Sequence, residues 1–556
     1  MTGMKTMRRL VVALACLVIG AQAVAADDPI FDVARLSSTP LNSRVIKSDE
    51  RDGIVTEEVR FHSETDGDKD VDIFAYFSYP KGASRLPAFI WNPGGLGQAN
   101  RGYTETPAKR GYAVLCIDFP QPGYRSTGNY PINTGLILGD DPKQAPIYHG
   151  AVALLKAVTF LESRSQVDAD RIGMSGASWG GFFTTLMVGV DSRLKVGSCL
   201  YGTGSLQLGN AWWDGIVQSG PSPSAEQRER WRVTLDPAWR LALRKTPMGW
   251  FTTTNDAFYS MPAMMQTIRM CTGPTHLTLL PNWDHAMPQA FHNEHVYDWL
   301  DVHLRGRAAF TKVSPISVTR DADQLVANWD FVGDAASADL IVSYGEDGNW
   351  RGRYWHTLPA EIVDGKCRAH FPAAKLPCFV SGTVVDKHGI RSSTPLLQAD
   401  SVLLGIHPSI LCPDYDGCRE WGGFEESQIE FLTRHNQCGQ VRWLPKLSTD
   451  AKDGKHSAIL ELDRTVLPPI LSTANVPHRF SCFLKADVPA AVTIQLAGET
   501  RDYSIGTEWT EATLDLTPAN SVMGGIGASI TNPSKSRILI DSIQIRPVLT
   551  SQDSGI

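Results

Sequence analysis

The sequence predicts an α/β domain built on a mostly parallel sheet, followed by two smaller β-sandwich domains. From about residue 55 to 310, short apolar runs that favour strands alternate with stretches of helical periodicity, as in a sheet covered by helices. From about residue 312 the long helical stretches end, and short alternating strands are separated by turns. A third segment, from about 404 to 547, continues the strand pattern, and 556 residues are enough for three such units.

The predicted strands of the α/β domain cover residues 71–79, 86–91, 111–119, 171–174, 194–201, 250–254 and 276–280. Helical periodicity is expected over 148–163, 179–190 and 291–305. We assign residues 26–310 to this domain, 311–402 to the middle sandwich and 403–556 to the C-terminal sandwich. The joining segments near 311 and 402 are short, so the domains are expected to pack against each other.

The composition is that of an ordinary globular protein, with 42% hydrophobic and 20% charged residues. The chain has 52 Lys and Arg against 59 Asp and Glu, which gives a formal net charge of −7. Because no block of basic residues stands out, the sequence lacks the electrostatic pattern of a nucleic-acid-binding protein. Neutral or uncharged partners suit it better than polyanions.

The first 25 residues have the features of a secretory signal peptide. Arg8 and Arg9 form a basic start, residues 10–20 are apolar, and Ala23-Val24-Ala25 is a small-x-small cleavage pattern. The apolar run is too short for a membrane span and no later stretch is long enough, so no transmembrane segment is expected. A buried helix or a lipoprotein signal ending at Cys16 fits less well. We expect a secreted or periplasmic protein.

An oxidising compartment permits disulfide bonds between the cysteines that remain after signal removal. Cys116 and Cys199 lie in apolar, strand-like runs and are expected to be buried thiols. Cys367 and Cys378 flank a predicted hairpin and are candidates for a bond. Four C-terminal cysteines could form two further bonds, and three pairings of them are possible: Cys412, Cys418, Cys438 and Cys482.

Gly176-Ala177-Ser178-Trp179-Gly180 matches the G-x-S-x-G pattern of a nucleophile elbow. A predicted strand precedes the pattern and an apolar helix follows it. A tight strand-to-helix turn leaves no room for side chains at the flanking positions, which explains the glycines. It also holds the serine hydroxyl at the start of the helix. Ser178 is therefore predicted to be a nucleophile rather than a structural serine in a glycine-rich turn.

A serine nucleophile needs a base and an acid that orients the base. In hydrolases with such an elbow these follow in the order Ser, Asp or Glu, His, each after a strand. Asp256 ends the predicted strand over 250–254, and His285 lies in the loop after the next strand. The sequence therefore predicts that Asp256 is the acid and His285 the base.

The alternatives for these two roles are less well placed. His276 lies inside a predicted strand, and Asp284 is too close in sequence to His285 to orient its ring easily. Asp214 is a further alternative for the acid. Three histidines lie on the last predicted helix of the domain and are expected at its surface: His292, His295 and His303.

An oxyanion hole requires two convergent backbone N–H groups. One is expected from Trp179, directly after the nucleophile. The other is expected from the loop after residues 86–91, Asn92-Pro93-Gly94-Gly95-Leu96-Gly97, at Gly95 or Leu96. Glycines let a backbone approach a substrate closely, although a plain glycine-rich turn also fits this loop.

The run over 168–181 resembles the acetyl xylan esterase and dienelactone-hydrolase-like branch of the α/β-hydrolases. So do Asn255-Asp256-Ala257-Phe258 and Tyr201-Gly202-Thr203-Gly204. This resemblance covers about residues 50–305 and implies an α/β-hydrolase fold and a serine esterase that acts without a cofactor, often on acetylated carbohydrate. The sequence departs from the branch at Asn92-Pro93-Gly94-Gly95, where many relatives carry His-Gly-Gly-Gly. Prolyl-oligopeptidase-type peptidases share the elbow, but the chain has no room for their N-terminal propeller.

The C-terminal sandwich resembles the jelly-roll carbohydrate-binding modules of polysaccharide-degrading enzymes. Gly422-Gly423-Phe424-Glu425-Glu426 is similar to their opening strand, and residues 537–545 to their last. The resemblance implies a structural calcium ion near Glu425, Glu426 and Asp541, although solvated surface acids are the alternative. The middle sandwich resembles fibronectin-type spacers. Between the nucleophile and Asp256, the tryptophans of an insertion form either its own core or a sugar-stacking surface: Trp212, Trp213, Trp231 and Trp239.

Together these features predict a secreted serine esterase that removes acyl groups, in particular acetyl, from carbohydrate. An esterase of other small acyl esters and a peptidase are alternatives that keep the same three side chains. A non-catalytic glycan-binding protein is the third, but a scaffold without activity has no need of Ser178, Asp256 and His285 in this order.

Overall fold

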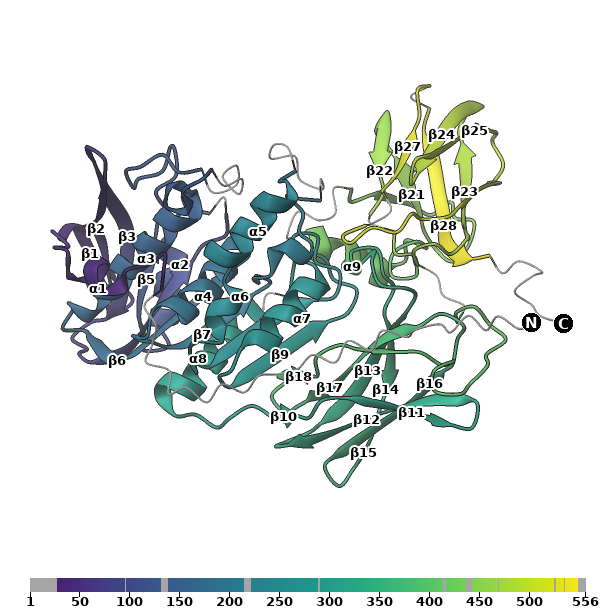
Figure 1. Cartoon of the computed structure of the whole chain (residues 1–556). Helices are drawn as coiled ribbons and strands as arrows, with labels where there is room; N and C mark the ends of the chain where they lie inside the picture. Colours follow the sequence, from purple (N-terminus) through teal and green to yellow (C-terminus); the bar gives the residue numbers. More distant parts are fainter. Residues whose placement is uncertain are drawn as a thin grey trace, which may run out of the picture.

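The computed structural model describes residues 28–95, 97–131, 139–214, 222–288, 291–413, 417–436, 443–468, 470–524, 527–534 and 536–548, without the side chains of 292–293 and 434–436. The predicted signal peptide, Leu96, Cys438 and the side chain of His292 lie outside these residues. The α/β domain forms one side of the molecule in Figure 1, and the two sandwiches lie beside it.

The α/β domain is organised around one mixed sheet in the order β1-β2-β3-β5-β4-β6-β7-β8-β9. Strands β1 to β3 and the β3–β5 pair are antiparallel, and the other neighbours are parallel. This order confirms the predicted α/β-hydrolase fold. The strands are β1 (Arg44–Arg51), β2 (Ile54–Asp66), β3 (Lys69–Pro80), β4 (Leu86–Asn92), β5 (Ala113–Ile117), β6 (Val167–Ala177), β7 (Leu194–Leu200), β8 (Met248–Thr253) and β9 (Thr275–Leu280).

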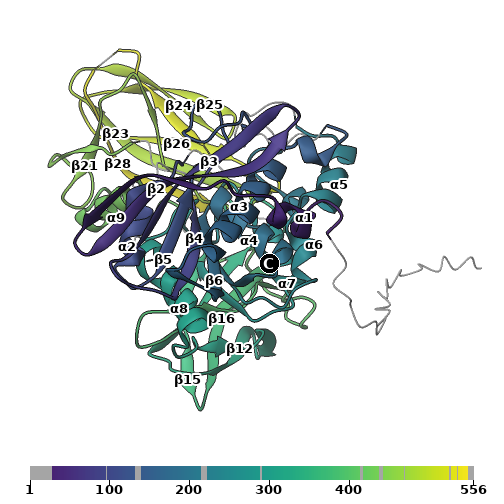
Figure 2. The ribbon, with the colours of Figure 1, turned by 90° about the vertical axis from the view of Figure 1, so that its left-hand side faces the viewer.

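Helices cover both faces of this sheet (Figure 2). Helices α3 and α4 pack in the larger core on one face, and α8 packs with the start of α2 against the other. The predicted helix over 291–305 begins as a π-helical turn, Phe291–His295, before α8. The helices are α1 (Val33–Ser38), α2 (Arg101–Ala108), α3 (Pro146–Glu162), α4 (Trp179–Val190), α5 (Ala225–Thr234), α6 (Ala238–Leu241), α7 (Met261–Met270) and α8 (Val296–Arg305).

The middle sandwich packs two antiparallel sheets over a core that includes Trp329 and Phe371. Cys367 and Cys378 lie in this core as free, buried thiols, so the predicted bond between them is wrong. They belong to different sheets, where each fills space as a small apolar residue. The strands are β10 (Lys312–Val313), β11 (Ser317–Asp321), β12 (Gln324–Val332), β15 (Glu361–Val363) and β16 (Lys366–Pro372), then β13 (Ser337–Tyr344), β14 (His356–Pro359), β17 (Cys378–Val385), β18 (Arg391–Ser393) and β19 (Leu397–Ala399).

The C-terminal sandwich also has two antiparallel sheets, but it opens with a helix rather than the predicted strand. Helix α9 (Glu426–Asn436) begins at the end of the glycine-rich segment, because Ile429 and Leu432 share a face that packs on the core. The strands are β20 (Lys446–Ser448), β21 (Ser457–Leu460), β23 (His478–Ala486), β26 (Thr510–Leu516) and β28 (Ile538–Pro547), then β22 (Arg464–Val466), β24 (Ala490–Leu496), β25 (Glu499–Ile505) and β27 (Ala528–Thr531).

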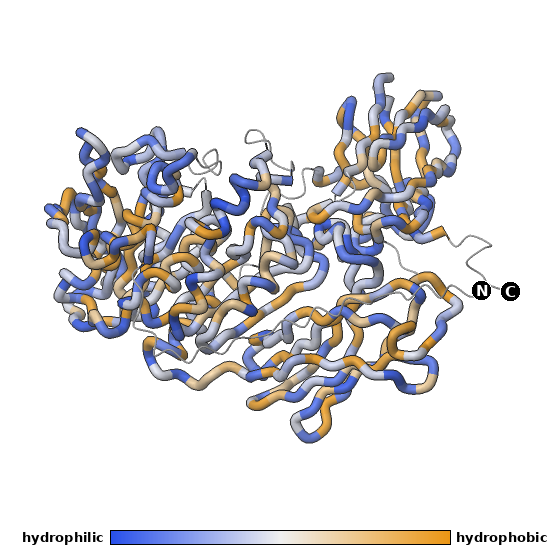
Figure 3. The backbone as a smooth tube through the Cα atoms, in the orientation of Figure 1, coloured by the Kyte–Doolittle hydropathy of each residue, from blue (hydrophilic) through white to orange (hydrophobic). Residues whose placement is uncertain are grey.

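The domains pack against each other, as the short joining segments predict. Strand β9 is the edge of the large sheet, and the middle sandwich covers it. Thr278 Oγ1 donates to the carbonyl of Arg391 at 2.7 Å, and the Leu279 N–H donates to Ser393 Oγ at 3.1 Å. Hydrophobic residues concentrate in the strands and packed helices, whereas α5 is strongly hydrophilic (Figure 3). Among the described helices, none has the length and apolarity that a bilayer crossing requires.

Candidate active site

The elbow at Ser178 is a strained turn between β6 and α4. Ser178 has φ 57° and ψ −120°, outside the regions that non-glycine residues ordinarily adopt. Its N–H donates to the carbonyl of Leu200 at 3.0 Å, and its own carbonyl accepts the N–H of Phe182 at 2.9 Å. Such a conformation costs about 1–3 kcal/mol and persists only where the surrounding structure fixes it. The backbone therefore presents the Ser178 side chain in one fixed direction.

The two glycines of the motif are required by the close approach of β4. A Cβ atom added to Gly176 would lie 2.6 Å from the carbonyl oxygen of Asn92, and one added to Gly180 would lie 2.0 Å from it. Backbone cannot move aside as a flexible side chain can. As the sequence predicts, no side chain fits at either glycine position. The atoms that a side chain would meet belong to Asn92, at the end of β4.

The structure brings the three predicted side chains together. Ser178 Oγ lies 2.8 Å from His285 Nε2, and His285 Nδ1 lies 2.8 Å from Asp256 Oδ2 and 3.0 Å from Oδ1. Ser178 follows β6, Asp256 follows β8 and His285 follows β9, so all three lie at the carboxyl edge of the sheet. In this geometry the hydroxyl can pass its proton to Nε2 while Nδ1–H donates to the carboxylate.

The acid is fixed by its own loop. Asp256 is 1% exposed, and its Oδ1 accepts the backbone N–H groups of Phe258 at 2.6 Å and Tyr259 at 3.0 Å. These bonds prevent the carboxylate from rotating away from the imidazole. The carboxylate can therefore orient the ring without a search over rotamers.

Aromatic rings enclose the imidazole of His285. The ring centroids of Tyr201 and Phe258 lie 4.6 and 4.5 Å from it, and that of Tyr259 lies 5.9 Å away. Tyr259 was not anticipated from the sequence. Burial raises the pKa of its hydroxyl well above the usual value, and the negative charge of Asp256 adds to this. The phenol therefore stays neutral beside the site.

The insertion tryptophans are mainly core residues. Trp231 is fully buried and packs against Trp213 and Phe182. Trp212 is 5% exposed and extends this core to the elbow, where its ring lies 4.7 Å from that of Trp179. The core interpretation accounts for these three rings, and Trp212 also contributes to the apolar wall beside the nucleophile.

The loop after β4 lies next to the nucleophile. A Cβ atom added to Gly94 would lie 3.7 Å from Ser178 Cβ, an ordinary contact distance, so the Gly94 backbone lies directly beside the nucleophile. The carbonyl of Gly95 accepts a hydrogen bond from Gln121 Nε2 at 3.1 Å, which holds that carbonyl in place. Of the three predicted oxyanion donors, Trp179 directly follows Ser178, Gly95 follows the Gly94 that lies beside Ser178, and Leu96 is outside the described residues.

The alternative residues take other places. His276 is 6% exposed inside β9, where its Nε2 lies 3.0 Å from Thr278 Oγ1. Burial lowers its pKa to about 3, which makes it a poor base at neutral pH. Asp214 is exposed and accepts the N–H of Asn210. His295 and His303 are half-buried rather than on the surface, and burial lowers both pKa values.

Asp284, which the sequence analysis rejected as the acid, has a structural role that was not predicted. Its Oδ1 accepts the backbone N–H of His285 at 2.8 Å and that of Ala257 at 2.7 Å, so one oxygen ties the loops after β8 and β9 together. Burial raises the pKa of this carboxyl, whereas the nearby Arg351 guanidinium opposes the rise. A carboxylate next to His285 is too close to orient the ring, yet well placed to hold the backbone.

Two of the three residues predicted to lie near a calcium ion bind backbone N–H groups. Asp541 Oδ2 accepts the N–H groups of Lys452 at 2.7 Å and Asp453 at 3.0 Å, and Glu425 Oε1 accepts that of Lys455 at 2.7 Å. Glu426 is exposed at the start of α9. Across the described ranges, no three carboxylate, histidine or cysteine side chains gather as metal ligands would. The carboxylates of Asp541, which is buried, and Glu425, which is partly exposed, thus hold the turn before β21.

Solved structures similar to this chain include several esterases. An acetyl xylan esterase from Paenibacillus sp. R4 is 22% identical over 50% of this chain and 96% of its own, with a TM-score of 0.43. Acetyl xylan esterase 1 from Thermoanaerobacterium sp. JW/SL YS485 is 16% identical over 50% and 95%, with a TM-score of 0.42. A glucuronoyl esterase from Solibacter usitatus is 12% identical over 47% and 86%, with a TM-score of 0.35. No protein-family model and no curated protein matches the chain.

Replacing Gly180 by alanine is expected to destabilise the fold strongly. The new Cβ would meet the backbone of Asn92 at 2.0 Å, which forces β4 and α4 apart. We expect a loss of about 3 kcal/mol or more in the free energy of unfolding, measured by denaturant titration. Gly506→Ala is the matched control, because a Cβ there meets nothing within 4 Å. Equal stability of the two variants would contradict the close approach.

His276 is expected to make stability fall as the pH is lowered. Its pKa is about 3 in the folded protein and an ordinary 6.5 in the unfolded chain, so between these values only the unfolded state takes up a proton. Each pH unit below 6.5 then costs about 1.4 kcal/mol. We therefore expect the free energy of unfolding to fall between pH 7 and pH 5 by about 2 kcal/mol less in His276→Gln than in wild type, as measured by urea titration at each pH. His407→Gln, which changes an exposed histidine, is the control and should show the same pH dependence as wild type. If His276→Gln also shows the wild-type pH dependence, the lowered pKa of His276 is contradicted.

Proposed function

We propose that this protein is a secreted serine esterase that removes acyl groups, in particular acetyl, from carbohydrate. The observation that carries the proposal is the continuous chain of short contacts from Ser178 through His285 to the buried Asp256. These side chains stand at a strained elbow on an α/β-hydrolase sheet, where a hydroxyl is held for attack. The preference for acetylated carbohydrate is supported by the sequence resemblance of the run over 168–181.

The arrangement supports a two-step mechanism. Ser178 Oγ attacks the ester carbonyl carbon as His285 Nε2 takes its proton, and Asp256 stabilises the imidazolium through Nδ1–H. His285 then gives the proton to the leaving alcohol, which departs and leaves an acyl-enzyme. Water attacks this ester with His285 again as base, and the acid is released as Ser178 is restored.

Backbone donors next to Ser178 support stabilisation of the oxyanion. Trp179 is the first residue of α4, so its N–H has no carbonyl one helical turn earlier to bind. The Gly94 backbone lies beside Ser178, and we propose that Gly95, the next residue, supplies the second donor. Donors fixed by the fold need no reorganisation when negative charge develops, which is the main source of rate enhancement at such sites.

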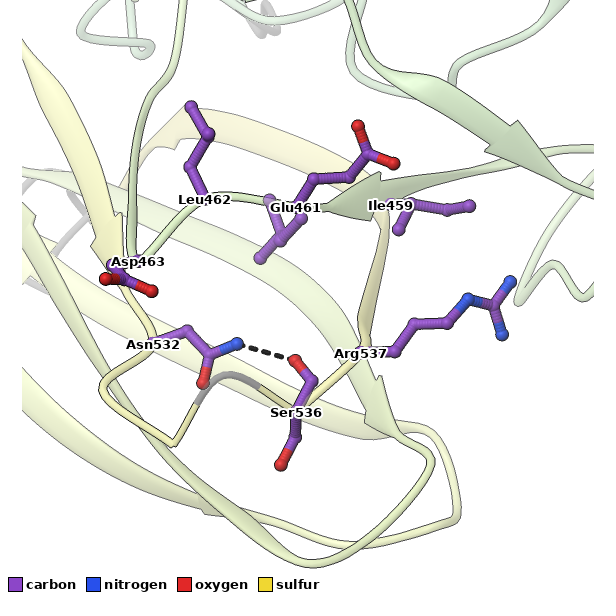
Figure 4. Close-up of a pocket in the computed structure, with 8 residues that line it drawn as sticks. Ile459, Glu461, Leu462, Asp463, Asn532, Ser536 and Arg537 are labelled. Carbon is purple, nitrogen blue, oxygen red and sulfur yellow. Dashed lines mark hydrogen bonds between the residues drawn. The ribbon is translucent and has the colours of Figure 1, made fainter.

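The C-terminal sandwich is proposed to contact the carbohydrate. Trp421 and Trp443 are buried in its core and offer no stacking surface. A pocket of about 390 Å³ lies between the ends of β21 and β28, and its side chains are mostly polar (Figure 4). Hydrogen bonding, rather than stacking, would therefore recognise a sugar there. The polar residues that line the pocket include Glu461, Asp463 and Arg537.

Ser178→Ala is expected to abolish hydrolysis while the fold persists. We expect kcat on a small chromogenic acetate ester to fall by about 10⁴- to 10⁶-fold, as in other serine hydrolases, because the proposed acyl-enzyme forms on the Ser178 hydroxyl. Ser165→Ala, in an exposed turn before β6, is the matched control and should keep the wild-type rate. A Ser178→Ala enzyme that retains more than about a tenth of the rate rules out the nucleophile.

The substrate class is tested by product analysis. The purified full-length protein is incubated with acetylated xylan, a methyl glucuronate ester, longer acyl esters and peptides, and the released group is identified by chromatography. We expect acetate from the acetylated polysaccharide. Release of amines from peptides would replace the proposal with a peptidase, and release of longer acids alone would replace it with an esterase of other acyl groups.

A further inference from the structure

A segment of the middle sandwich binds the loops that carry the proposed acid and base. Asn255 directly precedes the acid, and its Nδ2 donates to the carbonyls of Arg351 at 2.9 Å and Arg353 at 2.7 Å. Asn282 lies in the loop of the base. Its Nδ2 donates to the Trp355 carbonyl at 2.7 Å, and its Oδ1 accepts the Trp355 N–H at 2.8 Å. Both loops are therefore fixed from outside the α/β domain.

A charged contact joins this segment to the carboxylate that ties the two loops together. Arg351 Nη2 and Nε lie 3.2 and 3.3 Å from Asp284 Oδ2, while Asp284 Oδ1 accepts the N–H groups of Ala257 and His285. The side chain of Asp284 is only 8% exposed. A carboxylate buried to this degree needs a cationic partner to stay ionised, and Arg351 supplies it.

The C-terminal sandwich fixes the same segment from its other side. The N–H groups of Trp350 and Arg351 donate to the carbonyls of Val522 and Met523 at 3.2 and 3.1 Å, in the manner of paired strands. Asn349 Oδ1 also accepts the Ser521 N–H at 2.9 Å. Residues 349–351 are thus held between the catalytic loops and a third domain.

We propose that Arg351 is a positioning residue, which acts through Asp284 to hold the two loops of the proposed acid and base at their working distance. The inference rests on the proposed function and deepens it, because the acid–base pair of the α/β domain is completed from the middle sandwich. Reacting groups must be held within about 0.5 Å, and a displacement of about 1 Å costs roughly 10²-fold in rate. Without the guanidinium, the loops lose an ionic contact that reaches both of them through Asp284.

The test uses the full-length protein and compares three variants of Arg351 (to Met, Lys and Ala) with a control variant. Arg351→Met keeps a long side chain without charge, and we expect kcat on the acetate ester to fall about 10- to 100-fold with KM nearly unchanged. Arg351→Lys should recover most of the rate, and guanidinium ion added to Arg351→Ala should restore part of it. Arg368→Met, which removes an exposed arginine paired with Asp321, should match wild type.

Hydrogen exchange measures the positioning without relying on activity. In Arg351→Met, exchange should become faster in residues 254–259 and 281–286, and stay unchanged in 171–177 at the elbow. Uniformly faster exchange, or a loss of rate that neither lysine nor guanidinium restores, would assign Arg351 to fold stability and overturn the inference. So would wild-type kcat and exchange in Arg351→Met.

The proposed function can fail separately from the positioning role. A wild-type protein that hydrolyses no ester, and whose Ser178 is not labelled by a fluorophosphonate, would overturn the esterase proposal. The exchange measurement would still decide whether Arg351 fixes the two loops.

Discussion

The close packing of β4, β6 and the start of α4 is the constraint on which the candidate site depends. Gly180 lies so close to the Asn92 carbonyl that no side chain fits, and this contact forces the turn between β6 and α4. Ser178 must then adopt a positive φ, which points its hydroxyl at the carboxyl edge of the sheet. The same packing brings the Gly94 backbone beside the nucleophile. Nucleophile and proposed oxyanion donors are thus products of one steric requirement.

Two buried carboxylates divide the work around His285. Asp256 faces the imidazole Nδ1, whereas Asp284 binds backbone N–H groups and faces the Arg351 guanidinium. Burial raises the pKa of the Asp284 carboxyl, and the nearby charge of Asp256 adds to this rise. The Arg351 guanidinium beside Asp284 opposes this rise, whereas Asp256 is held by backbone N–H groups. An arginine from another domain therefore bears on the electrostatics of the proposed triad.

The three domains contact one another at the loops of the candidate site and are not independent units joined only by linkers. The middle sandwich binds Asn255 and Asn282, and the C-terminal sandwich binds the segment that does so. Val522 of the C-terminal sandwich also contacts Gly209, in the loop after β7, where an added Cβ would lie 2.4 Å from its Cγ1. Because the loops that carry Asp256 and His285 are bound on several sides, they are expected to move little relative to the elbow.

The local pattern of the chain was enough to predict the α/β-hydrolase domain, the change to sandwiches near residue 312, and the residues that meet at the elbow. Strand, glycine-flanked serine and helix are adjacent in sequence, and the order Ser178, Asp256, His285 follows from where predicted strands end. These are short-range signals, so they survive without knowledge of the fold. The assignment of catalytic roles to those residues remains a prediction.

Tertiary structure alone decided the features that depend on distant contacts. The pairing of Cys367 with Cys378 was wrong because sequence spacing does not reveal that the two strands belong to different sheets. The segment 422–426 leads into a helix because Leu432 packs in a core formed mostly by residues distant in sequence. Arg351 is 67 residues from Asp284, and no local pattern links a sandwich loop to the histidine loop. Periodicity reports which face of an element is buried; only the folded chain determines what that face meets.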